Sequence, residues 1–99
     1  MRYTYYRAMP LLEANELIKN EIYINTKRNR GLTWWTETFA DASRYANESR
    51  VIVRIVLDRP LTGRQVAEYI NEVPHIEYSM TSYNFNKHLC NLIEDIAII

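Results

Sequence analysis

The chain has 99 residues, of which 47% are hydrophobic, and its 12 basic side chains equal its 12 acidic side chains in number. This length predicts a single domain over residues 1–99 that folds on one core, and the hydrophobic fraction excludes a disordered chain. A formal net charge of zero excludes a general electrostatic attraction to nucleic acid or to a membrane surface.

The N-terminal third predicts a strand, a helix and two more strands. Residues 2–8 carry several tyrosines and a threonine with an alternation of residue type, which favours a strand. Pro10 suits the first turn of a helix, and the apolar residues that follow recur at helical spacing as far as Ile18. Residues 21–25 predict a short strand, and residues 32–36, which are aromatic and rich in threonine, predict the next one.

The middle of the chain predicts a second helix, a strand and a third helix. Thr38 with an acid three residues later has the form of a helix N-cap. Residues 50–58 are the clearest strand, and their apolar residues populate both faces apart from Arg54, which is typical of a central strand. Residues 62–65 form a capping box, and the apolar spacing that follows predicts a helix that continues to Val73.

The last quarter permits more than one interpretation. Residues 76–83 suit a strand or a loop, residues 84–93 have an apolar helical face, and residues 95–99 suit a short final strand. The order of elements lacks the regular alternation of a doubly wound sheet. We therefore predict an α+β fold: a compact single domain with a split, mostly antiparallel or mixed sheet and flanking helices.

The sequence predicts neither a metal site nor a cysteine nucleophile. Cys90 has no second cysteine to pair with, and its two-residue spacing from His88 is poor for contact on a helix. His75 and His88 show no metal-ligand spacing. Because there is no disulfide framework and no apolar stretch long enough to span a bilayer, we expect a reducing, cytoplasmic setting and no membrane partner.

Three segments carry side chains suited to binding a ligand. The first predicted strand contains Tyr6-Arg7, and the aromatic strand reads Gly31-Leu-Thr-Trp-Trp-Thr36. Because successive strand residues face opposite sides, either Trp34 or Trp35 can point into a cleft while the other packs in the core. Tyr45 follows on the inner turn of the next predicted helix.

These segments resemble the NAD-binding domain of ADP-ribosyltransferases of the diphtheria-toxin and cholera-toxin type and of poly(ADP-ribose) polymerases. The resemblance covers about residues 3–57, and it implies the fold of that family, NAD as substrate and transfer of ADP-ribose to a macromolecular acceptor. It also implies an arginine on the phosphate or the ribose edge, two aromatic side chains that clamp nicotinamide, and a glycine for close backbone approach. The implied cofactor-binding residues are Arg7, Gly31, Trp34, Thr36 and Tyr45.

The family keeps its catalytic glutamate on a final strand, followed by apolar residues. In this sequence Asp95 stands directly before Ile96 and takes that position, and Glu94 lies one residue earlier. A carboxylate there would stabilise the oxocarbenium-like charge that develops as the bond to nicotinamide breaks. The sequence has no Ser-Thr-Ser motif and no Glu-x-Glu pair, so both the catalytic activity and the choice between the two acids stay open.

Other functions remain open as well. A compact, neutral, tyrosine-rich domain suits a non-catalytic inhibitor of the phage or mobile-element type, since tyrosine and tryptophan are good interface anchors. We expect a protein target as the partner, and the sequence does not fix the oligomeric state. A nucleic-acid module would combine Lys27, Arg28 and Arg30 with Trp34, but the net charge of zero argues against it.

Overall fold

The computed structural model describes residues 1–20, 32–67 and 74–99 of the chain. The elements in chain order are β1 (Tyr3–Pro10), α1 (Leu11–Asn20), β2 (Leu32–Thr36), α2 (Phe39–Ser43), β3 (Arg50–Leu57), β4 (Arg64–Ala67), β5 (His75–Thr81), α3 (Ser82–His88), the short 3-10 helix η2 (Cys90–Leu92) and β6 (Ile93–Ile98). The predicted strands at 2–8, 32–36 and 50–58 are therefore confirmed. The predicted strand at 21–25 and the loop after it lie outside the described residues.

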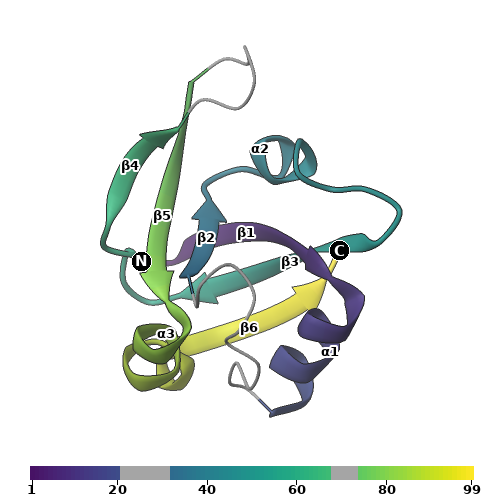
Figure 1. Ribbon diagram of the computed structural model, residues 1–99. Helices are drawn as coiled ribbons and strands as arrows, with labels where there is room; N and C mark the ends of the chain where they lie inside the picture. The colour runs from purple at the N-terminus through teal and green to yellow at the C-terminus, as the bar shows by residue number, and fades with distance from the viewer. Residues whose placement is uncertain (21–31, 68–73) are drawn as a thin grey trace.

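The six described strands form one sheet in the order β4-β5-β2-β1-β3-β6, as Figure 1 shows. Every pairing between the described strands is antiparallel, which confirms the α+β class and, over the described residues, favours the antiparallel form of the predicted sheet over the mixed form. The two central strands, β1 and β2, pair only at Tyr6 and Thr36. The sheet is therefore nearly divided into β4-β5-β2 and β1-β3-β6, and the two halves run in clearly different directions (Figure 1).

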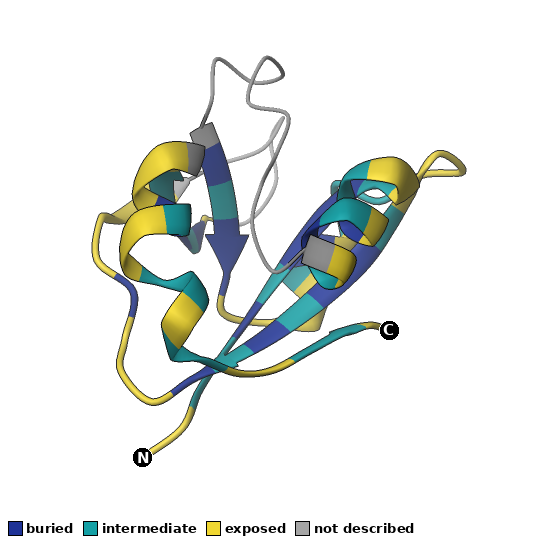
Figure 2. Ribbon diagram, turned by 90° about the horizontal axis from the view of Figure 1, so that it is seen from below, coloured by how far each residue is buried: buried dark blue, intermediate teal, exposed yellow. Residues whose placement is uncertain are grey.

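Helices cover both faces of the sheet. In Figure 1, α1 and α3 lie on one side of it and α2 lies on the other. The larger apolar cluster lies beneath α1 and α3, where Trp35 stacks on Phe85 with ring centroids 5.6 Å apart. A smaller cluster of Ala8, Ala42 and Ile52 lies beneath α2. In Figure 2 the buried residues accordingly concentrate in the strands, while the helices present exposed residues to solvent.

The helix predicted from residue 62 is wrong over the part that the structure describes. Residues 64–67 form β4, which pairs with β5, and Val66 is 67% exposed instead of facing a helical core. Gly63 explains the difference, because its φ of +82° turns the chain back into the sheet. A Cβ on Gly63 would lie 2.6 Å from the carbonyl oxygen of Ser79, so this approach requires glycine.

The last quarter resolves into a strand, a helix and a strand. The segment that suited a strand or a loop is β5, which begins at His75. The following helix, α3, ends at His88, earlier than predicted, and the η2 turn leads into β6. Thr81 and Thr38 are the N-caps of α3 and α2, and each side-chain oxygen accepts a hydrogen bond from the backbone N–H three residues later.

Two buried tyrosines should make the protein less stable at alkaline pH. Burial is the main cause that raises the pKa of Tyr5 and of Tyr78 above the ordinary value of 10.0. Since folding favours their neutral forms, their contribution is complete below pH 10 and is lost as the pH rises through the raised pKa values. We expect the urea midpoint of unfolding to fall steadily above pH 10.

A matched variant separates this effect from general alkaline denaturation. The Tyr5 hydroxyl accepts a hydrogen bond of 3.0 Å from the buried N–H of Leu61. Tyr5→Phe should therefore lower the unfolding free energy by about 1–3 kcal/mol at neutral pH and make the loss above pH 10 shallower. Two results would contradict the role of the buried tyrosines. One is a urea midpoint of the wild type that increases as the pH is raised above 10, and the other is an equally steep loss of stability above pH 10 in Tyr5→Phe.

Candidate functional site

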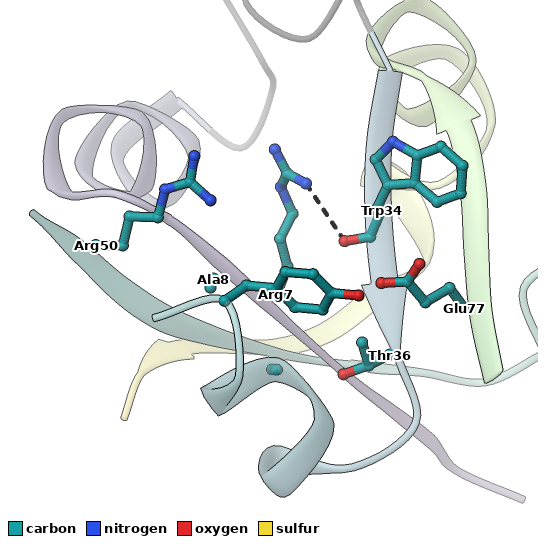
Figure 3. A pocket seen from close by; sticks show the side chains of 8 residues that line it. Arg7, Ala8, Trp34, Thr36, Arg50 and Glu77 are labelled. Atoms are coloured by element: carbon teal, nitrogen blue, oxygen red, sulfur yellow. Dashed lines mark hydrogen bonds between the residues drawn. The ribbon is translucent and has the colours of Figure 1, made fainter. Parts of the chain in front are cut away.

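A cavity of about 440 Å³ opens where β1 and β2 separate, and this volume falls in the range of small-molecule sites. It lies at the seam between the two halves of the sheet and receives side chains from β1, β2, β3, β5 and the α2 region (Figure 3). The lining residues are Arg7, Ala8, Trp34, Thr36, Ala42, Tyr45, Arg50 and Glu77.

The structure brings together four of the five residues that the resemblance implied for cofactor binding. Arg7, Trp34, Thr36 and Tyr45 all line this cavity. Strand alternation explains the choice between the two tryptophans, because Trp34 and Thr36 share the cavity face of β2 while Trp35 is fully buried in the core. The fifth residue, Gly31, lies outside the described residues.

The two predicted catalytic acids lie elsewhere. Glu94 and Asp95 are on β6, an edge strand, and line a separate cavity of about 240 Å³. Asp95 accepts a hydrogen bond of 3.2 Å from Nη2 of Arg54, and Glu94 forms an ion pair of 3.2 Å with Arg2. The strand order explains the separation, since β1 and β3 stand between β6 and the aromatic strand β2. Neither acid therefore shares a cavity with Arg7.

Arg7 bridges the gap between the separating strands. Arg7 is only 5% exposed, and its Nη1 donates a hydrogen bond of 3.3 Å to the backbone carbonyl of Trp34. Its Nη2 lies 3.5 Å from Oε2 of Glu13 on α1, in an ion pair that is itself largely buried. The guanidinium thus takes the place of a ladder hydrogen bond between β1 and β2, and Glu13 neutralises its charge.

Sequence reasoning missed the carboxylate of this cavity, which belongs to Glu77. This residue lies on β5 opposite Thr36 of β2, so the two side chains share one face of the sheet. It is 7% exposed and lines the cavity. The sequence indicated only that Glu77 lies in a segment that could form a strand. The pairing of β5 with β2 is what places that segment beside the aromatic residues.

A buried histidine joins two walls of the cavity. Nε2 of His75 lies 3.1 Å from the hydroxyl of Tyr45 and 3.4 Å from Oε1 of Glu77. The tautomer of the ring decides whether Nε2 donates a hydrogen bond to the tyrosine hydroxyl or accepts one from it. Nδ1 of His75 is buried and has no hydrogen-bond partner among the described residues. One ring nitrogen thereby positions both the aromatic hydroxyl and the carboxylate.

The cavity combines two kinds of recognition chemistry. Trp34 and Tyr45 provide aromatic surfaces for a planar group, and the Glu77 carboxylate can stabilise a positive charge on that group or next to it. The guanidinium groups of Arg7 and Arg50 can contact anionic oxygens. Among the described residues, no cluster of three or more His, Cys, Asp or Glu side chains could hold a metal ion.

Comparison with known proteins gives a limited similarity. The chain is 29% identical over 93 residues to Cln5-like protein 2 of Dictyostelium discoideum, in an alignment that covers 94% of this chain and 27% of that protein. The chain thus spans about a quarter of the length of this relative. No protein-family model and no solved structure matches the chain. In the described part of the chain, no helix has the length and apolar character needed to cross a membrane.

Proposed function

We propose that the protein binds NAD in the cavity between β1 and β2 and transfers its ADP-ribose to a macromolecular acceptor. One observation carries the proposal: Arg7, Trp34 and Tyr45 come from three separate segments and line one cavity. The resemblance in sequence required these residues to share a site, and nothing in their local spacing forces them together. Glu77 adds the carboxylate that this chemistry needs to the same cavity.

The aromatic residues supply the binding surface for nicotinamide. Trp34 is partly buried on β2, and Tyr45 is partly buried just after α2. A planar cationic ring between two aromatic side chains gains dispersion and cation–π attraction. The hydrogen-bond contact between Tyr45 and His75 fixes the position of the tyrosine, so little entropy is lost when the ligand binds.

Glu77 supplies the electrostatic part of the reaction. The bond between the nicotinamide nitrogen and C1′ of the ribose breaks, its electron pair leaves with neutral nicotinamide, and positive charge develops on the ribose. The carboxylate of the buried Glu77 stabilises that charge. An acceptor nucleophile then forms a bond to C1′ and gives its proton to this carboxylate or to water.

The test is direct. NAD labelled in its adenylate group is incubated with the purified protein and a cell lysate, and NAD is titrated in parallel while tryptophan fluorescence is recorded. We expect saturable quenching, since Trp34 lines the site, and transfer of label to an acceptor. An absence of both quenching and transfer would contradict the proposal, and binding of a host protein would then favour the inhibitor alternative.

A further inference from the structure

The two arginines of the cavity differ in how much of their charge is available to a ligand. Arg7 is buried, donates to the carbonyl of Trp34 and is neutralised by Glu13. Arg50 is exposed, and among the described residues its side chain forms no ion pair or hydrogen bond. Of the two arginines, Arg50 is therefore the one whose charge no carboxylate of the described residues neutralises.

The position of Arg50 gives the cavity a direction. It is the first residue of β3 and pairs with Pro10 at the end of β1. In Figure 3 its side chain lies on one side of the cavity, Trp34 and Glu77 lie on the other, and Arg7 lies between them. One end thus carries a guanidinium that pairs with no carboxylate in the described part of the chain, and the other carries a carboxylate beside an aromatic ring.

We propose that Arg50 forms an anion subsite for the pyrophosphate of a dinucleotide and so determines the direction in which the ligand lies. The Glu77 carboxylate repels phosphate and attracts a cationic ring, whereas a guanidinium binds phosphate oxygens through two parallel hydrogen bonds. The nicotinamide end then faces Trp34 and Glu77. This inference rests on the proposed function for the identity of the ligand, whereas the anion contact is testable by itself.

Calorimetric titrations of ADP-ribose, inorganic pyrophosphate and nicotinamide test the subsite. In Arg50→Gln we expect the affinities for ADP-ribose and pyrophosphate to fall about tenfold, which is the usual effect of one charge-assisted contact, while the affinity for nicotinamide is unchanged. Arg59→Gln is the matched control, because Arg59 is also exposed, lies outside this cavity and pairs with its neighbour Asp58. This control should bind all three ligands like the wild type.

A second variant should change the affinity in the opposite direction. Glu13→Gln removes the carboxylate that neutralises Arg7, so the affinity for pyrophosphate should rise in any preparation whose circular dichroism shows that it is folded. Wild-type binding of pyrophosphate in Arg50→Gln, or an equal loss in Arg59→Gln, would overturn the subsite even if NAD still binds. Binding of pyrophosphate that depends on Arg50, without any binding of NAD, would support the subsite and contradict the proposed function.

Discussion

Replacing Glu77 with glutamine should lower the rate of ADP-ribose transfer by about a hundred- to a thousandfold, the usual effect of removing one preorganised electrostatic group from an active site. The amide has nearly the same shape as the carboxylate and can keep the contact of this side chain with His75, so the fold should be retained. The binding of NAD should change much less than the rate, because the charge on the ribose develops as the bond breaks. Transfer of label at saturating NAD measures the effect.

The acids of β6 provide the matched controls. Asp95→Asn and Glu94→Gln remove carboxylates that lie at a different cavity and pair with Arg54 and Arg2. Both variants should transfer ADP-ribose at nearly the wild-type rate. Loss of transfer in Asp95→Asn with retention in Glu77→Gln would instead place the chemistry on β6, as the sequence predicted.

The adjacent tryptophans should respond to alanine substitution in opposite ways. Trp35 is fully buried and stacks on Phe85, so Trp35→Ala should lower the unfolding free energy by about 3–5 kcal/mol. Trp34 faces the cavity, so Trp34→Ala should weaken NAD binding by about 1–3 kcal/mol, by analogy with the stacking of bases on aromatic side chains, and should change stability little.

Chemical denaturation and NAD titration of both variants measure the two effects separately. Trp35→Phe is the control for the core, since it keeps an aromatic ring against Phe85 and should recover part of the lost stability. For a domain of this size, 1 kcal/mol corresponds to a change of about 4–8 °C in the melting temperature, so the loss in Trp35→Ala should be large. Equal loss of stability in both alanine variants would show that Trp34 is a core residue and would remove it from the proposed site.

The sequence predicted the parts of the fold that depend on local patterns. The strands β1, β2 and β3 have tyrosine, tryptophan or β-branched residues in strand-like runs, and α2 has its cap at Thr38. The four residues of β4 were misjudged because a capping-box pattern overlaps a glycine whose positive φ ends any helix there. Local residue patterns compete at such points, and the tertiary pairing with β5 decides between them.

In the candidate site, too, local sequence patterns predicted some residues and tertiary pairing determined the others. Arg7, Trp34, Thr36 and Tyr45 were predicted because their segments resemble a family with a known arrangement. Glu77 was not predicted, because it reaches the cavity only through the pairing of β5 with β2, which joins residues far apart in the sequence. The acids near the end of the chain lie on β6, and the strand order places β1 and β3 between that strand and β2.

The single pair between β1 and β2 also determines the energetic cost of having a cavity. A hollow inside an apolar core loses packing contacts and makes the protein less stable. This cavity instead occupies the place where further backbone hydrogen bonds between the two central strands would have formed. One backbone oxygen on its edge, that of Trp34, has the Arg7 side chain as its partner. The protein therefore gives up ladder hydrogen bonds, which water or a polar ligand can replace, and keeps the packed cluster around Trp35 intact.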